Sequence, residues 1–493
     1  MKKDILRFSS PAEAGVSPRA VTAFLDDVAD RGFAMHGFLF LRHGKVFAEG
    51  YYAPFQKDEP HRMYSVSKTF VSMAVGALIG EGKLKLSDRV ASFFPDKCPP
   101  DLHPWVADAT VRDLLMMATP FNNQTYTPGD PDWVYTFFNT VPNHPAGTVF
   151  RYDTSGTYVL DALVERITGK SFLEYLKEKA LLEIGFTPDA RCVEAPEGIA
   201  WGGSGVLCSA RDLARLALLV SRDGVWEGKE LLPSDYVREA KARQIDNATA
   251  GHRSLISGRG YGYQIWRAFH DGYSFTGMGG QLALTFPSLD LIAVFIGDSQ
   301  GHQDPYGGVV EALKYRIVDP LAAGDASPDP EGEKELAERI SSLSLALPAG
   351  EASSPLAKAV SGKSFRLNRN PMGITSFSLA LGEEEGVFRY ETLRGPRALS
   401  FGLGKYVLSE FPEKHYSGIR IGSPAGRGYR TASAAVWTEE HKLALRVYLI
   451  DNYFGNLNVT FSFKGDEAGL SFEKTAEWFL EEYSGMAGGR TED

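Results

Sequence analysis

The stretch Met63–Ser72, MYSVSKTFVS, places three serines, a lysine and a threonine where an apolar segment begins. The apolar run that follows predicts a helix over residues 69–79. Residues three apart lie on the same face of a helix, so Ser65 and Lys68 would lie side by side, one turn apart. The helix dipole would favour an alkoxide on Ser65, and burial would favour the uncharged amine of Lys68. The stretch therefore predicts a serine nucleophile with its own base.

Ser-x-x-Lys is a short pattern, and the chain contains it a second time, at Ser471–Lys474. A short motif alone does not assign catalysis, so the surroundings of each copy decide. The first copy opens a strongly apolar helix, whereas the second precedes an acidic amphipathic segment with Glu477, Glu481 and Glu482. We therefore interpret Ser471 as structural, in a region predicted to be the edge of a β domain followed by a helix.

The composition of the 493 residues excludes several classes of protein. Apolar residues make up 43% and charged residues 23%, which is typical of a globular protein, and the formal net charge of -10 argues against nucleic acid as a partner. No apolar run approaches 18 residues, and the N-terminus lacks the apolar run of a secretory signal. We expect a cytoplasmic protein that does not contact a membrane. Three widely spaced cysteines predict neither a disulfide framework nor a metal site.

Strands occur early and late in the first part of the chain, with helices between them. Residues 37–50 predict a hairpin with its turn at His43-Gly44, and residues 281–286 and 291–296 predict two further strands around a Pro-Ser turn. Joining early and late strands in one antiparallel sheet, flanked by helices and accompanied by a helical subdomain, gives an α+β domain over residues 1–320.

Residues 321–335, LAAGDASPDPEGEKE, are rich in Pro, Gly, Ala and acidic residues and lack periodicity, so they are predicted to be a linker. Beyond them we expect a smaller, mostly β domain over residues 336–493, of a barrel or lipocalin-like kind. Its strongest strand signals lie at residues 376–381, 386–392, 443–450 and 457–463.

Two further elements carry polar groups suited to chemistry. Tyr152 lies in a polar turn that precedes a predicted helix over residues 156–167. Residues 274–281, SFTGMGGQ, bring three glycines to the start of a strand, where something could approach the backbone closely. A packed tyrosine and a tight turn would explain each element equally well.

The order of these three elements resembles the serine β-lactamase and penicillin-binding-protein-like family, in particular its class C β-lactamase, D-aminopeptidase and esterase branch. That family carries Ser-x-x-Lys on a buried helix, a Tyr-x-Asn or Tyr-x-Ser turn and a Lys/His-Thr-Gly strand. Longer stretches are similar as well, namely TVRDLLM at residues 110–116, PAG at 145–147 and GGSGVLCSARDL at 202–213. The resemblance spans roughly residues 8–318 and implies a β-lactamase/transpeptidase-like fold.

The resemblance also implies roles for individual residues. Ser65 would be the acylated nucleophile, with Lys68 and Tyr152 sharing the proton transfers. Thr276 and Gly277 would lie on the strand that edges the site. The backbone N–H groups of Ser65 and Met278 would form the oxyanion hole.

Two positions depart from the family pattern. Thr154 stands where the family usually has Asn, and it offers no amide donor to a substrate carbonyl. Phe275 stands where β-lactamases and carboxypeptidases place Lys or His, and it cannot bind a substrate carboxylate. We therefore expect an esterase or amidase acting on an uncharged, partly apolar acyl compound, ahead of a β-lactamase or D-Ala-D-Ala carboxypeptidase. Four aromatic residues are either core or pocket lining: Trp133, Tyr135, Phe137 and Phe138.

The predicted protein is thus a serine hydrolase or peptidase that forms an acyl-enzyme on Ser65 and acts on a small ester or amide. No cofactor is expected, because the chain contains no zinc-type Cys/His spacing, P-loop or dinucleotide-binding glycine motif. A catalytically inactive binding or regulatory protein that retains the fold stays open as an alternative, and so does assembly into a homo-oligomer.

Overall fold

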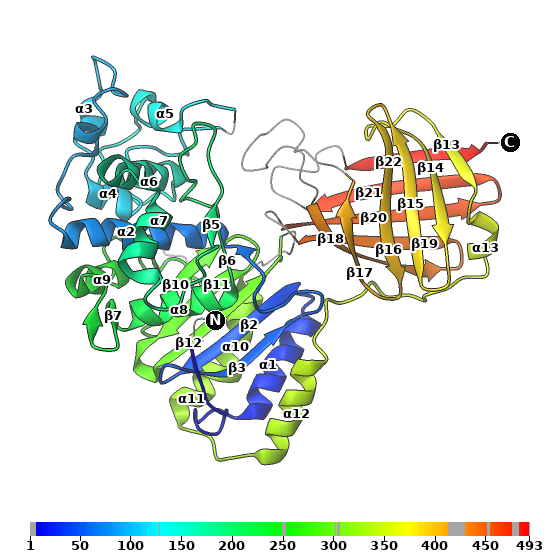
Figure 1. Ribbon diagram of the computed structural model, residues 1–493, viewed down its shortest axis with the longest axis horizontal. Coiled ribbons are helices and arrows are strands. Elements are labelled where there is room, and N and C mark those ends of the chain that lie inside the picture. Colours follow the sequence, from blue (N-terminus) through cyan, green and yellow to red (C-terminus); the bar gives the residue numbers. More distant parts are fainter. Residues whose placement is uncertain are drawn as a thin grey trace. The chain divides into compact units, whose positions relative to one another are not determined.

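The computed structural model describes residues 6–127, 129–248, 253–300, 302, 306–412, 429–450, 454–475 and 483–492. The chain divides into two compact units, residues 1–343 and residues 344–493 (Figure 1). The first unit combines a sheet with many helices, and the second is mostly β. The α+β prediction with a smaller, mostly β C-terminal part is confirmed.

The first unit is built on a seven-stranded sheet with the strand order β1-β3-β2-β12-β11-β10-β9. The early hairpin of β2 and β3 meets the late strands where β2 pairs with β12, and the pairings from β3 to β9 are all antiparallel. The sequence prediction that early and late strands share one sheet is therefore confirmed. The strands are β1 (Arg7–Phe8), β2 (Met35–Arg42), β3 (Lys45–Tyr51), β9 (Trp266–Arg267), β10 (Tyr273–Gly277), β11 (Gln281–Phe286) and β12 (Leu291–Gly297).

Helices cover this sheet and also form a separate group. Phe24 of α1 packs its ring against Phe40 of β2 and Phe295 of β12, while α8 packs on β2, β11 and β12. Helices α3 to α7 gather apart from α1 and α12, with α2 between the group and the sheet (Figure 1). The α-helices are α1 (Pro18–Asp30), α2 (Ser67–Gly80), α3 (Pro104–Ala107), α4 (Val111–Leu115), α5 (Trp133–Asn139), α6 (Thr154–Thr168), α7 (Phe172–Leu176), α8 (Ala210–Ser221), α9 (Ser234–Lys241), α10 (Gly307–Leu313), α11 (Asp319–Ala323) and α12 (Pro330–Ser341).

The predicted linker at residues 321–335 requires correction, because α11 and α12 occupy most of it. The segment begins a helix for local reasons: Pro330 occupies the first turn, and the Asp329 side chain accepts the N–H of Gly332. Leu336 is buried, and Arg19 of α1 pairs with Asp329 at 2.8 Å. Proline and acidic residues here form a helix N-terminus rather than a flexible connection, and the first unit extends to Leu343.

In the second unit, a ten-stranded sheet curls until β16 pairs with β18 as well as with β15, so that the described strands close on themselves. Aromatic and aliphatic side chains such as Phe377, Phe388 and Phe461 fill the interior. The strands are β13 (Ser364–Leu367), β14 (Ile374–Leu381), β15 (Glu385–Thr392), β16 (Gly395–Leu403), β17 (Val407–Phe411), β18 (Tyr429–Glu439), β19 (Lys442–Ile450), β20 (Phe454–Lys464), β21 (Glu467–Thr475) and β22 (Gly485–Thr491).

The second Ser-x-x-Lys lies inside β21, which pairs with β20 on one side and β22 on the other. Ser471 therefore lies on a strand that is paired on both sides. Side chains three apart on a strand point to opposite faces, so Ser471 and Lys474 do not form a pair. The acidic segment expected to be helical after them, with Glu477, Glu481 and Glu482, lies outside the described residues.

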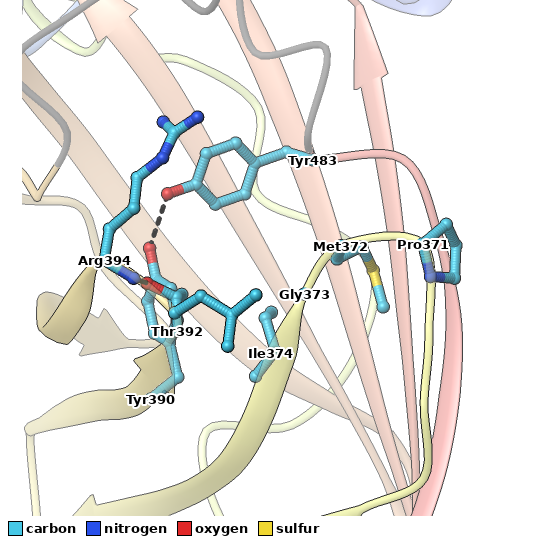
Figure 2. Close-up of a pocket in the computed structure, with 9 residues that line it drawn as sticks. Pro371, Met372, Gly373, Ile374, Tyr390, Thr392, Arg394 and Tyr483 are labelled. Carbon is cyan, nitrogen blue, oxygen red and sulfur yellow. Dashed lines mark hydrogen bonds between the residues drawn. The ribbon is translucent and has the colours of Figure 1, made fainter.

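One end of the second unit holds a small pocket of about 200 Å³ (Figure 2). Its lining is mainly apolar, with Met372 and Ile374 among the side chains drawn. The hydroxyls of Tyr390 and Tyr483 are hydrogen-bonded to each other at 2.7 Å at its inner side. This hydrogen bond gives each buried hydroxyl a partner, and it links the segment just before β22 to β15.

Candidate active site

Ser65 lies in a single 3-10 turn, Tyr64–Val66, that leads directly into α2. The chain enters the turn through Tyr64, a buried residue with φ of 47°. A bulky residue with a left-handed backbone is strained, and such strain is characteristic of functional turns. The predicted helix is confirmed and begins two residues earlier than the apolar run indicates, so that Ser65 lies in the turn just before it and is partly accessible.

Lys68 is 1% exposed and points back toward Ser65. Its Nζ lies 3.0 Å from Ser65 Oγ and donates a hydrogen bond of 2.6 Å to the carbonyl oxygen of Gly203. The amine also lies 5.0 Å from the ring centroid of Tyr152. The structure therefore brings together the three residues that the sequence singled out for chemistry.

The turn at residues 201–205, WGGSG, supplies the carbonyl that Lys68 uses, and two buried side chains hold it. Arg62 donates from Nε to the carbonyl oxygen of Ser204 at 2.9 Å, and its guanidinium lies over the rings of Tyr64 and Trp201. Asp161 accepts the N–H of Gly202 at 2.9 Å, and burial raises the pKa of its carboxyl well above the usual range. Anchoring from both sides fixes the carbonyl that orients Lys68.

Tyr152 precedes α6, whose N-terminus is capped by Asp153 through the N–H of Ser155. Tyr152 is 40% exposed, and its ring stacks on that of Trp266 with centroids 5.4 Å apart. Desolvation of the hydroxyl raises the pKa of Tyr152, and a hydrogen bond with Ser65 opposes that rise. The phenol is therefore protonated at neutral pH and directed at the serine.

The end of β10 lies against the serine turn. A Cβ atom on Gly277 would lie 2.3 Å from the carbonyl oxygen of Met63, so only glycine permits this approach. The next residue, Met278, has its carbonyl fixed by Gln281, whose Nε2 donates to it at 2.8 Å. Gln281 also bonds both backbone groups of Gly297 on β12. The sheet thus sets the orientation of the strand end beside Ser65.

The two departures from the family pattern lie close to this arrangement. Thr154 packs against the turn that carries the lysine's acceptor, because a Cβ atom on Gly203 would lie 2.3 Å from Thr154 Cγ2. Phe275 is 1% exposed on β10, whereas its neighbour Thr276 lines a pocket. Strand alternation places these two side chains on opposite faces. Of the four aromatic candidates, Trp133, Phe137 and Phe138 are core, and Tyr135 is exposed.

Sequence reasoning missed several residues that shape the site. Arg62 acts through the backbone of Ser204, far away in the chain, and Trp266 acts through a ring contact, so neither belongs to a local motif. Gln281 ends the stretch SFTGMGGQ, but the sequence assigned it no role of its own. The GGSG stretch at residues 202–205 was the available signal, since adjacent glycines indicate close approach to the backbone. Among the described residues, no group of three His, Cys, Asp or Glu side chains is arranged to hold a metal ion.

The comparisons with known proteins agree with this geometry. The family model described as Beta-lactamase matches residues 21–307, which is more than half of the chain. The chain belongs to the beta-lactamase family. The matched range includes Ser65, Lys68, Tyr152 and the end of β10.

A curated member related to this chain is the 6-aminohexanoate-dimer hydrolase of Paenarthrobacter ureafaciens, which is 27% identical over 310 residues covering 58% of this chain and 79% of the relative. Two solved structures share the fold. One is a Bacillus anthracis protein provisionally assigned as a 6-aminohexanoate-dimer hydrolase, 20% identical, with a TM-score of 0.51 over 61% of this chain and 81% of that chain. The other is a Bacteroides dorei protein provisionally assigned as a beta-lactamase, 18% identical, with a TM-score of 0.51 over 61% and 98%.

These matches establish a beta-lactamase-fold hydrolase family for the first unit, and the resemblance inferred from the sequence is confirmed. Across the residues that the structure describes, no helix has both the length and the hydropathy that crossing a bilayer requires.

Proposed function

We propose that the protein is a serine hydrolase that forms an acyl-enzyme on Ser65 and cleaves a small ester or amide. The observation that carries the proposal is the 3.0 Å separation of Lys68 Nζ from Ser65 Oγ, with the same amine donating to Gly203. An amine that donates one N–H to a fixed carbonyl can turn its lone pair toward the serine. A nucleophile paired with an oriented base is the arrangement that covalent catalysis requires.

Acylation would proceed by transfer of the Ser65 proton to Lys68 while Oγ attacks the substrate carbonyl carbon. The burial of Lys68 supports an uncharged amine, because desolvation penalises the charged form. Tyr152, protonated and hydrogen-bonded with Ser65, would donate its proton to the leaving oxygen or nitrogen and recover one from Lys68. The carbon–leaving-group bond then breaks, and the acyl group remains on Ser65.

The oxyanion that forms during attack would be stabilised by the backbone N–H groups of Ser65 and Met278. Support comes from the contact of Gly277 with the serine turn, together with the hydrogen bond that fixes the Met278 carbonyl. A water molecule, activated by the same lysine and tyrosine, would then release the acid and restore Ser65. No step requires a cofactor.

For the substrate we favour a small linear amide or ester over a β-lactam. The 27% identical relative is named as a 6-aminohexanoate-dimer hydrolase, and a dimer of an amino acid is joined by an amide bond. Thr154 and Phe275 supply neither the amide nor the cation that the β-lactamase and carboxypeptidase pattern places at these positions. Hydrolysis of β-lactams or D-Ala-D-Ala peptides is therefore the second candidate activity, and a chromogenic cephalosporin is expected to be cleaved slowly or not at all.

A fluorophosphonate probe tests the nucleophile directly, because it reacts covalently with an activated serine. We expect labelling of the wild-type protein and none of Ser65→Ala. Ser471→Ala is the matched control, since Ser471 lies in the same pattern on β21 and should not affect labelling. A folded wild-type protein that is not labelled at any pH between 6 and 10 would favour the alternative, a binding or regulatory protein that retains the fold.

A further inference from the structure

A pocket of about 560 Å³ opens beside the proposed catalytic residues. It lies between the loop at residues 253–259, the end of β9, the face of β10 that carries Thr276, and the start of α10. A volume of this size accommodates a ligand of several carbon atoms. The residues that matter for the argument are Arg253, Leu255, Arg259, Trp266, Thr276 and Tyr306.

Three of these side chains connect the pocket to the catalytic group. Trp266 stacks on the ring of Tyr152. Thr276 is the residue before Gly277, whose backbone touches the serine turn. Tyr306 acts electrostatically on Tyr152, so the two phenols are near each other. A substrate whose carbonyl reaches Ser65 would therefore extend one of its ends into this pocket.

The pocket carries excess positive charge. Arg259 donates from Nε to the carbonyl oxygen of Ser254 at 2.6 Å, and within the described ranges neither Arg253 nor Arg259 forms an ion pair with a carboxylate. Glu311 also lines the pocket, but Arg31 pairs with it at 3.2 Å. Two guanidinium groups without ion pairs beside apolar walls create a local positive potential. Such groups bind carboxylates through charge-assisted hydrogen bonds.

We propose that this pocket selects substrates with a carboxylate at the end of an apolar chain, which Arg253 and Arg259 bind while Leu255 and Trp266 contact the chain. The inference rests on the proposed function and revises the expectation of an uncharged substrate, which followed from Phe275 alone. Phe275 is buried on the other face of β10. The positive charge is supplied instead by the loop that precedes β9.

Matched ester pairs test the charge preference. On the acyl side, the mono-p-nitrophenyl ester of adipic acid is compared with the same compound as its dimethylamide. On the leaving-group side, the acetate ester of 6-hydroxyhexanoic acid is compared with its dimethylamide. We expect the carboxylate to raise kcat/KM by roughly 10- to 100-fold in at least one pair, which is the range for hydrogen bonds to a charged group. The advantage should shrink as salt is added.

Arg253→Ala and Arg259→Ala should each lower kcat/KM far more for the carboxylate than for the neutral member of the pair, and so remove much of that advantage. Arg243→Ala is the control, because Arg243 is half exposed, pairs with Asp246 and does not line the pocket. Equal rates within both pairs, or an equal loss for charged and neutral substrates in the arginine variants, would overturn the inference.

Binding to Ser65→Ala separates this inference from the proposed function, because it needs no turnover. Titration calorimetry should detect adipate binding more tightly than 1,6-hexanediol, and Arg259→Ala in the same background should abolish the difference. Equal binding of the two compounds overturns the charged pocket even if the probe labels Ser65. Preferential adipate binding without any labelling keeps the pocket and removes the hydrolase.

Discussion

Lys68 Nζ and the carbonyl oxygen of Gly203 are 2.6 Å apart, although 135 residues separate them in the chain. The contact fixes the amine at the point where it also meets Ser65 Oγ. The orientation of the proposed base thus depends on a turn far away in the chain, and that turn depends on Arg62 and Asp161. Changes to the lysine and to the turn should therefore affect the same step.

Lys68→Ala should slow acylation of Ser65 by roughly 10² to 10⁴-fold, the range for loss of a general base. The burst of p-nitrophenol in a stopped-flow experiment with an activated ester measures that step directly. Lys474→Ala, in the second copy of the motif, should leave the burst rate unchanged. An unchanged rate in Lys68→Ala, with a native circular dichroism spectrum, would remove Lys68 from the mechanism.

Gly203→Ala should displace the acceptor of Lys68, because the new Cβ atom would lie 2.3 Å from Thr154 Cγ2. We expect this overpacking to raise the free energy of the acylation transition state by about 1.5 kcal/mol, which slows acylation roughly tenfold. Thr154→Ser removes that methyl group, so the double variant should recover part of the rate. Gly129→Ala is the control, since a Cβ atom there would have no neighbour within 4 Å among the described residues. Failure of the double variant to recover would show that the contact with Thr154 does not set the rate.

Tyr152→Phe should retain the stacking on Trp266 and lose the hydroxyl that interacts with Ser65. We expect a decrease of roughly 10² to 10⁴-fold in kcat with a smaller change in KM, because the lost group transfers a proton. Desolvation of its hydroxyl raises the pKa of Tyr152, so its proton stays in place as pH rises toward 10. The wild-type rate profile should accordingly show no loss from tyrosine ionisation below pH 10. A KM effect with unchanged kcat would indicate a binding role instead.

The buried pair of His36 and His61, with Nδ1 and Nε2 2.8 Å apart, should make the protein sensitive to acid. Burial lowers the pKa of His61 to about 3 and that of His36 well below its usual range. Both rings are neutral in the folded state, whereas in the unfolded chain they take up protons below about pH 6.5. Stability is therefore complete above that pH and falls as pH decreases from about 6.5 toward 3, by up to about 1.4 kcal/mol per pH unit for each histidine.

Urea unfolding midpoints at pH 7 and pH 5 measure this loss. His61→Asn should lower the stability at pH 7 and reduce its dependence on pH. His43→Asn provides the comparison, because His43 lies exposed on the hairpin turn between β2 and β3. Equal pH dependence of wild type and His61→Asn would assign the acid sensitivity to other groups.

The sequence predicted those features of the fold that local patterns encode. The hairpin turn at His43-Gly44 follows from turn chemistry and is confirmed. The helix predicted over residues 156–167 is also present, as α6, and ends at Gly169, which has φ of 69°. The linker prediction failed because proline and acidic residues are shared by flexible segments and helix N-termini, and only the packing of Leu336 distinguishes them.

For the site, the sequence supplied Ser65, Lys68 and Tyr152, and the structure brings them together. It could not supply Arg62 or the loop at residues 253–259, because their contacts join segments that are remote in the chain. The roles of the site residues, a cytoplasmic location and the state of assembly stay predictions.

The position of α12 determines where the chain can be truncated to give a fragment of the first unit that folds. A protein shortened at residue 320 would lack α12 and would expose to water the part of α1 that α12 covers. A fragment that ends at Leu343 retains α12 and its contact with α1. Residues 1–343 are therefore the smallest fragment on which the hydrolase can be assayed without the barrel, and shorter fragments should aggregate for reasons unrelated to Ser65.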